Sequence, residues 1–150
     1  MEENDFQIMK TKKQFLQRYN KTLKLIERLE AKLLALDDRL TSVGSPSISD
    51  LPRCSSGKTS SDLILDKIEL QDRINRLILK AKEQKGEIIE AIDELDDRRV
   101  AEVLESIYID GLDMYDISDQ TGYSVRHVYR LYIQGLNNIE LPQPMSVTCQ

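Results

Sequence analysis

The stretch DGLDMYDISDQTGYSVRHVYRL, Asp110–Leu131, decides how the C-terminal part of this chain folds. Glycine readily adopts the left-handed backbone conformation that closes a helix, so Gly111 and Gly122 are each predicted to end one. Asp113 and Ser124 follow these glycines, and both residue types are strong N-caps. The stretch therefore predicts two short helices joined by a turn of about three residues, an arrangement typical of a helix-turn-helix.

Apolar residues surround both caps in the pattern of a hydrophobic staple. In this motif the residue before the cap packs against a residue in the first turn of the helix. Leu112 and Ile117 hold these positions at the first cap, and Tyr123 and Val128 hold them at the second. The residues of this pair of helices that we expect to face the core are Ile117, Val128, Leu131 and Leu136.

A third helix is predicted before this pair. Asp96 or Asp97 can cap it, and five apolar residues follow at the spacing of one helix face. They are Val100, Val103, Leu104, Ile107 and Tyr108. Residues 96–139 are therefore predicted to form a small helical domain.

The outward side of the last helix, Ser124–Leu136, carries the candidate DNA-binding residues. It contains Arg126 and Arg130 and no acidic residue, which gives a charge of +2. Arginine pairs with guanine edges or phosphates, glutamine pairs with adenine, and backbone amides near a capped helix start bind phosphate. The predicted DNA-contacting residues are Ser124, Val125, Arg126, His127, Tyr129, Arg130 and Gln134.

Four aspartates oppose this interpretation. Asp110, Asp113, Asp116 and Asp119 cluster before the last helix, and they would repel phosphate if they faced it. They could instead face a basic protein partner. His127 is the only histidine in the chain, so we expect it to make a polar contact on the last helix rather than serve a metal or a reaction.

Two long amphipathic helices are predicted before the small domain. In the first, at about residues 5–40, apolar residues recur in alternating steps of four and three, the pattern of a coiled coil. Its stripe comprises Phe15, Tyr19, Thr22, Ile26, Leu29, Leu33, Leu36 and Leu40. The second, at about residues 61–95, has two adjoining seams, a face wide enough for more than one neighbour. One seam comprises Leu63, Leu70, Ile74, Leu77, Ala81, Ile88, Ala91 and Leu95, and the other Ile64, Ile68, Ile78, Ile89 and Ile92.

These stripes must be covered by another helix. We favour a hairpin within the chain, over residues 5–95, because the second stripe follows the first; an oligomeric coiled coil is the alternative. Charge supports antiparallel pairing. Residues 10–32 hold eight Lys/Arg and two Glu, giving +6, whereas residues 62–119 hold eight Lys/Arg and 17 Asp/Glu, giving −9. Residues 41–61, with eight Ser, are predicted to be a flexible linker, and residues 140–150 a disordered tail.

Several functional classes are disfavoured by the sequence. No run of 18 apolar residues is present, so we expect no membrane span, and the acidic start MEENDF predicts no secretory signal. Cys54 and Cys149 with a single histidine do not make a zinc set. The segment SSGKTS lacks the first glycine of a phosphate-binding loop, because that position is Pro52. Without a nucleophile–base arrangement, we expect no enzyme and no cofactor.

The segment LESIYIDGLDMYDISDQTGYSVRHVYRLYIQGL, Leu104–Leu136, resembles region 4 of sigma-70-type transcription initiation factors. That family has an Ile-Ala pair opening one helix, a Gly-x-Ser turn and an Ala-Leu pair near the end of the next helix. Ile117–Ser118, Gly122–Ser124 and Gly135–Leu136 stand at these places. Ser118 and Gly135 replace the usual alanines and lower the helix propensity, so the last turn is expected to fray.

The chain from about Phe6 to Ile139 is similar to a family of small phage and prophage proteins of Gram-positive bacteria. These proteins share a helical pair, a Ser-rich break, a phrase like EIIEAIDELDDRR and the ending GYSVRHVYRL. The family is without an established function, and the resemblance implies regulation of phage transcription in the cytoplasm of a bacterial host. Sigma regions that melt the promoter have no counterpart here, so a complete initiation factor is not expected.

Three functions stay open at this point. The first is a DNA-binding transcriptional regulator, with the helical pair dimerising it or binding host RNA polymerase. The second is the recognition subunit of a DNA-packaging machine, like a small terminase, in which such helices form a larger oligomer. The third is a protein-binding module that targets host RNA polymerase or a host defence protein through its acidic face.

Overall fold

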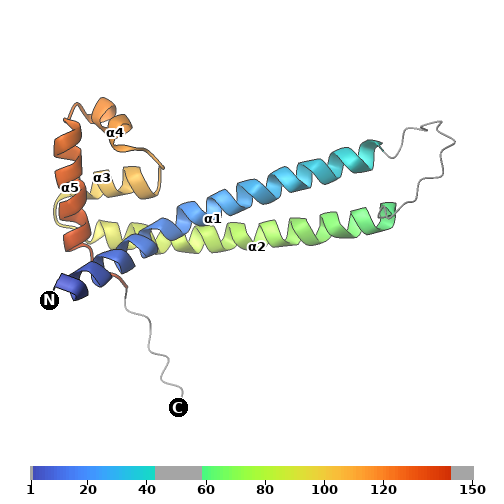
Figure 1. Ribbon diagram of the computed structural model, residues 1–150, viewed down its shortest axis with the longest axis horizontal. Helices are drawn as coiled ribbons and strands as arrows, with labels where there is room; N and C mark the ends of the chain where they lie inside the picture. The colour runs from blue at the N-terminus through green and yellow to red at the C-terminus, as the bar shows by residue number, and fades with distance from the viewer. Residues whose placement is uncertain (1, 43–58, 143–150) are drawn as a thin grey trace, which may run out of the picture. The chain divides into compact units, whose positions relative to one another are not determined.

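The computed structural model describes residues 2–42 and 59–142, which form five helices and no strand (Figure 1). The helices are α1 (Glu2–Ser42), α2 (Ser60–Asp93), α3 (Arg98–Tyr108), α4 (Met114–Thr121) and α5 (Val125–Asn138). The predicted all-α class, a helical hairpin followed by a small helical domain, is confirmed. Most of the predicted linker, residues 43–58, and most of the predicted tail, residues 143–150, lie outside the described residues.

The packing divides the chain into two compact units. One unit takes Thr22–Lys80, that is, the second part of α1 and the first part of α2. The other takes Met1–Lys21 and Ala81–Gln150, so the remaining parts of α1 and α2 belong with α3, α4 and α5. The predicted domain boundary between residues 95 and 96 stays a prediction. The hydrophobic core of this second unit contains residues from both sides of that boundary.

In the unit of residues 22–80, α1 and α2 bury one stripe against each other. Ile26 and Leu29 of α1 and Leu63 and Ile74 of α2 are buried, as the heptad pattern predicts. The Lys67 ammonium lies 2.5 Å from an Asp37 carboxylate oxygen. The hairpin is therefore closed within one chain over this region.

In the unit that holds the small domain, the buried face of α1 differs from the predicted stripe. Leu16, which the heptad leaves out, is fully buried, whereas its neighbour Phe15 is only half-buried. The physical reason is that α1 here has more than one neighbour. Its Leu16 joins a cluster that contains Ile88 of α2, Leu104 of α3 and Leu136 of α5. The heptad pattern describes contact between two helices only, so it does not predict that Leu16 rather than Phe15 faces the core here.

The second seam of α2 is only partly covered. Ile92 is buried in the cluster with α3 and α5, and Ile89 is half-buried. By contrast Ile64, Ile68 and Ile78 are exposed. The additional neighbour expected for this face therefore covers only the end of α2 that is near the small domain.

The capped stretch around Asp110–Leu131 folds as predicted. Asp97 caps α3, which ends at Tyr108 with Ile109 as its C-cap, slightly before the predicted Gly111. Gly111 has the left-handed conformation expected of it, with a φ of 73°. Asp113 caps α4 through a reciprocal pair of hydrogen bonds with Asp116. Gly122 ends α4 with a φ of 77°, and Ser124 caps α5 by accepting a hydrogen bond from the backbone N–H of His127. The connection between α4 and α5 is the predicted three residues.

The core beneath these three short helices also matches the staple pattern. Its buried members are Val100, Val103, Ile117, Val128 and Leu131. The staple residues Leu112 and Tyr123 are partly buried against it. Local capping and a few apolar contacts therefore account for the path of the chain from α3 to α5.

The expected fraying at Gly135 is wrong. Helix α5 continues to Asn138, and the N–H of Ile139 donates to the Gly135 carbonyl at 2.8 Å. A Cβ atom at Gly135 would lie 2.8 Å from carbons of both Leu104 and Val100. Gly135 is thus the point at which α5 crosses α3 too closely for a side chain, and packing outweighs its low helix propensity.

Candidate nucleic-acid interface

Helix α5 is the element on which the candidate interface is built, and both of its ends are held. Ser124 caps its N-terminus. At the other end, the Lys12 ammonium of α1 donates hydrogen bonds to the carbonyls of Leu136 and Asn137, at 3.0 and 3.2 Å. A cation there complements the negative end of the helix dipole. The helix is therefore fixed at both termini to the unit that carries it.

The middle of α5 is fixed by its contacts with α3. The hydroxyls of Tyr108 and Tyr132 lie 2.9 Å apart and share a hydrogen bond. Burial raises the pKa of the Tyr108 hydroxyl far above its usual value, and the bond to Tyr132 adds to this shift. Tyr132 is thus a packing residue of the α3–α5 contact.

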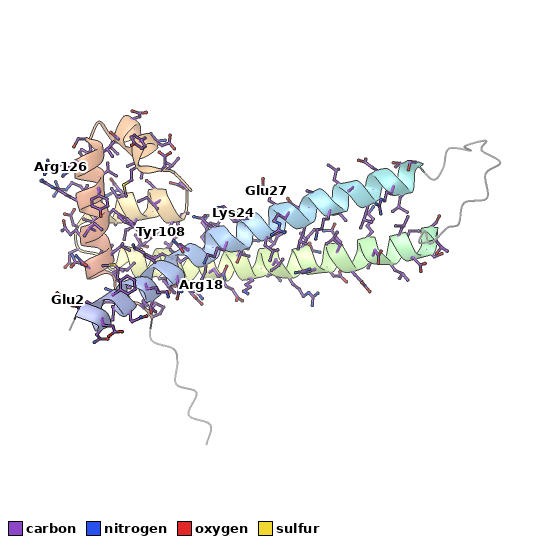
Figure 2. The ribbon with its side chains drawn as sticks, viewed as in Figure 1. Glu2, Arg18, Lys24, Glu27, Tyr108 and Arg126 are labelled. Atoms are coloured by element: carbon purple, nitrogen blue, oxygen red, sulfur yellow. The ribbon has the colours of Figure 1, made fainter. Side chains whose placement is uncertain are left out.

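The opposite side of α5 is open. One stripe, which we call the outer face, comprises Arg126, Tyr129, Arg130, Ile133, Gln134 and Asn137. Its members follow one another in steps that keep them on one side of a helix. Figure 2 shows the Arg126 side chain extending away from α3 and α4. The outer face carries two positive charges, two carboxamides and no carboxylate.

Arg126 and Arg130 are the cationic members of the outer face. Both are exposed, and within residues 2–42 and 59–142 neither takes part in an ion pair. They lie one helical turn apart, so their guanidinium groups can reach neighbouring acceptors on one partner. Each guanidinium group carries five N–H donors, and both groups are available to bind an anion.

The other predicted contact residues occupy different places. Ser124 Oγ is used in the cap, and Val125 is half-buried. The half-buried His127 ring lies edge-on to Tyr123, with ring centroids 4.9 Å apart. Tyr129 is 51% exposed on the outer face. Of the predicted set, Arg126, Tyr129, Arg130 and Gln134 thus come together, whereas Ser124, Val125 and His127 lie at the start of the helix and beside the turn.

The outer face also contains two residues that the sequence analysis missed. Ile133 and Asn137 line a shallow groove along α5 together with Tyr129 and Arg130. Continuing the steps of three and four from Arg126 and Arg130 along the helix would have found both.

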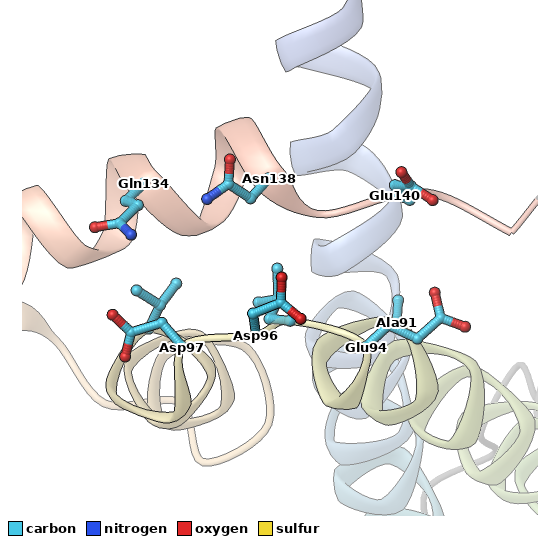
Figure 3. Close-up of a pocket in the computed structure, with 9 residues that line it drawn as sticks. Ala91, Glu94, Asp96, Asp97, Gln134, Asn138 and Glu140 are labelled. Carbon is cyan, nitrogen blue, oxygen red and sulfur yellow. The ribbon is translucent and has the colours of Figure 1, made fainter.

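An acidic pocket borders the C-terminal half of α5. Its volume is about 570 Å³, and it lies between α5 and the junction of α2 with α3 (Figure 3). It is lined by Ala91, Glu94, Leu95, Asp96, Asp97, Val100, Gln134, Asn138 and Glu140. The pocket carries four carboxylates, so a polyanion approaching α5 is favoured at Arg126 and Arg130 and repelled beyond Gln134. Gln134 lies on the border of the two regions.

The carboxylates near α5 differ in how they are used. The guanidinium of Arg99 hydrogen-bonds to Asp97 and holds the pKa of that carboxyl below its usual value. Asp113 and Asp116 are paired in the cap of α4. Over the described parts of the chain, no group of three or more His, Cys, Asp or Glu is arranged to hold a metal ion.

No helix in residues 2–42 or 59–142 combines the length and the apolar character needed to cross a membrane. The candidate site is a protein surface made of one capped helix, with a basic start and an acidic border. It offers hydrogen-bond donors and acceptors to a partner.

Comparisons with known proteins point to a family of unknown function. The family model described as "Protein of unknown function (DUF1492)" matches residues 42–140, about two thirds of the chain. This region runs from the end of α1 through α5 and so includes the whole outer face. No curated protein and no solved structure matches the chain. The chain therefore belongs to the DUF1492 family.

Proposed function

We propose that this protein is a DNA-binding transcriptional regulator that places α5 in the major groove. The observation that supports this most is the pair of Arg126 and Arg130, exposed on one side of a helix capped at its start and following a three-residue turn. Two short helices joined in this way form a helix-turn-helix, whose second helix reads base edges. The resemblance of residues 104–136 to sigma region 4 supports the same function.

The roles of the residues follow from their chemistry. Arg126 and Arg130 bind guanine edges or phosphates, and Gln134 offers a carboxamide that can pair with adenine. The Ser124 side chain accepts a hydrogen bond from the N–H of His127. The other backbone N–H groups of the first turn of α5 can therefore bind a phosphate. His127 and Tyr123 support the turn. The basic first helix and the α1–α2 hairpin provide the dimer contact or a contact with host RNA polymerase.

The direct test is a binding screen of the full chain against fragments of the genome that encodes it. A fragment bound in preference to competitor DNA is expected. The double variant Arg126→Ala, Arg130→Ala should weaken binding to that fragment at least about tenfold, since each good arginine–base pair contributes roughly 1–3 kcal/mol. Arg28→Ala with Arg39→Ala removes the same charge from exposed positions of α1 and serves as the matched control.

The salt dependence of DNA binding separates sequence-specific recognition from general electrostatic attraction to phosphates. Each phosphate contact that is lost should reduce the slope of log K against log salt by about one. Arg126→Lys keeps the charge but loses the planar fork, so it should reduce sequence preference more than the slope. Equal binding of the wild type and the double variant, with the control unchanged, would contradict the assignment of α5.

The second candidate is a module that binds a basic protein partner, and the four carboxylates of the pocket beside α5 favour it. It predicts no DNA affinity even at low salt, where phosphate contacts are strongest. The mass of the assembly in solution distinguishes a packaging subunit from a regulator. A ring of eight or more chains favours packaging, and a dimer favours regulation.

A further inference from the structure

Among the described residues of the unit 22–80, one long apolar stripe of α2 is exposed. On α2, the five apolar side chains Ile64, Leu65, Ile68, Ile78 and Leu79 are between 36% and 62% exposed. With Gln71, Asp72 and Asn75 they form a continuous band, which we call the α2 stripe. It flanks the face of α2 that Leu63 and Ile74 bury towards α1, and Leu40 of α1 borders its first part. Contiguous exposed apolar side chains of this kind mark an interaction surface.

We propose that the α2 stripe binds the α2 stripe of a second copy of this chain, in antiparallel orientation. The two apolar ends of the stripe, Ile64–Leu65 and Ile78–Leu79, lie at equal distances from a point between Gln71 and Asp72, whereas Ile68 falls at the level of Asn75. An antiparallel pair with its two-fold axis there brings Ile64 beside Ile78 and Leu65 beside Leu79 of the partner, because such an axis keeps residues of one helix flank together. Both apolar ends of the stripe are then covered by the partner, and the same surface serves both chains, as a two-fold interface requires.

The charges beside the stripe favour the same orientation. Residues 62–72 of α2 hold four acidic residues and one Lys, giving −3, whereas residues 73–80 hold two Arg and one Lys, giving +3. Antiparallel pairing places the acidic part of one helix against the basic part of the other. Parallel pairing in register would instead bring like charges together. Glu69 and Arg76 lie close to symmetric positions and are the pair expected to meet across the interface.

The centre of the stripe is polar and sets the register. The Gln71 side-chain Nε2 donates a hydrogen bond to Oδ1 of Asn75 at 3.3 Å, so these two side chains are paired with each other. Polar residues inside an apolar seam lower stability but specify register and partner number. A shift of the two helices by one turn would move Ile64 and Leu65 away from the apolar end of the partner. This interface involves no residue of α5, so it does not depend on the proposed DNA binding.

The first test is the mass of the full chain in solution by light scattering. The structure predicts a dimer of twice 17.3 kDa. Leu65→Glu with Leu79→Glu should raise the dissociation constant of the dimer at least about tenfold, which is about 1.4 kcal/mol. The matched control is Leu23→Glu with Leu34→Glu, which changes two exposed leucines of α1. Helix content by circular dichroism must stay unchanged in both variants.

The second test reports the orientation without disrupting the interface. Cys54 and Cys149 are first replaced by serine, and Leu65→Cys and Leu79→Cys are introduced in separate chains. A disulfide between the two chain types, with neither type cross-linking to itself, is expected, because a disulfide needs Cα atoms within about 7 Å. A bond between two Leu65→Cys chains would show a parallel pair and overturn the proposal. A monomer at tens of micromolar, or a ring, would overturn it as well.

A charge reversal gives an independent check. Glu69→Arg alone should weaken the dimer, because two arginines then face each other. Adding Arg76→Glu should restore it, while the net charge returns to that of the wild type. Failure of the double variant to recover the dimer would contradict the antiparallel pairing of these two residues. DNA is absent from all of these measurements, so their outcome is separate from that of the binding screen.

Discussion

At the scale of single residues, the most informative position is Gly135. Sequence reasoning treats a glycine near the end of a helix as a weak point, because it lowers helix propensity by about 1 kcal/mol relative to alanine. In the folded chain, the Cα atom of Gly135 faces Leu104 and Val100 at a distance that leaves no room for a methyl group. The residue is required by the close crossing of α5 and α3, which in turn fixes the direction of the outer face.

Gly135→Ala is therefore expected to destabilise the fold by about 1–3 kcal/mol, the usual cost of overpacking a core. The matched control is Gly86→Ala, since Gly86 lies within α2 and a Cβ there meets nothing within 4 Å. That control should stabilise the chain by up to about 1 kcal/mol, because alanine favours helix. Chemical denaturation of both variants measures the free energy of unfolding, which should fall for Gly135→Ala and rise for Gly86→Ala. A stable Gly135→Ala variant would contradict the close crossing.

Asp97 provides a prediction about pH. Its pKa is lowered in the folded state by the side-chain hydrogen bond with Arg99, relative to its ordinary value of 3.8. A carboxyl with a lowered folded-state pKa stabilises the fold above its unfolded-state pKa, and this contribution is lost as the pH falls through the folded-state pKa. Wild-type stability should thus decline below about pH 4 more steeply than that of Asp97→Asn, which keeps a side-chain cap but does not titrate. Parallel acid titrations followed by circular dichroism check the difference.

At the scale of elements, α5 is positioned from both ends by different parts of the chain. Its start is set locally, by Gly122 and Ser124. Its end is held by Lys12, which lies more than a hundred residues away in the sequence. The local cap decides where the helix begins, and the distant lysine joins the helix to α1.

Replacing Lys12 by methionine should destabilise the unit that carries α5 by about 0.5–2 kcal/mol. The change removes a charged donor from two carbonyls at the negative end of the helix while keeping much of the apolar stem. Lys10→Met is the control, because Lys10 is exposed. Hydrogen exchange of the last turn of α5 should rise in the first variant only. If protection there were equal in both, Lys12 would not be acting as a cap.

At the scale of the whole molecule, the two proposals place two surfaces on two different units. The outer face of α5 belongs to the unit of residues 81–142 with 2–21, and the α2 stripe belongs to the unit of residues 22–80. A dimer through the α2 stripe would carry two copies of α5. Two-fold DNA-binding proteins read two half-sites separated by about 34 Å or a multiple of it.

The wild-type chain is accordingly expected to bind DNA with two inverted half-sites more tightly than DNA with one. Leu65→Glu with Leu79→Glu should lose this preference while its affinity for a single half-site stays within about twofold, because α5 is unchanged and only the avidity is removed. Fluorescence anisotropy with both DNAs measures it. If a monomeric variant kept this preference, binding to two half-sites would not depend on the α2 stripe.

The local structure of this chain could be predicted from its amino-acid sequence. The caps at Asp97, Asp113 and Ser124, the turn at Gly122 and the long amphipathic helices all depend on interactions between residues a few positions apart, which a linear pattern contains. Four of the residues predicted to contact DNA, Arg126, Tyr129, Arg130 and Gln134, also lie together on the outer face. Only the tertiary structure decided that Leu16 is core, that Lys12 holds the end of α5, that Gly135 must lack a side chain and that an acidic pocket borders Gln134. Each of these depends on which distant helices meet, and periodicity along one helix does not say which neighbour covers it.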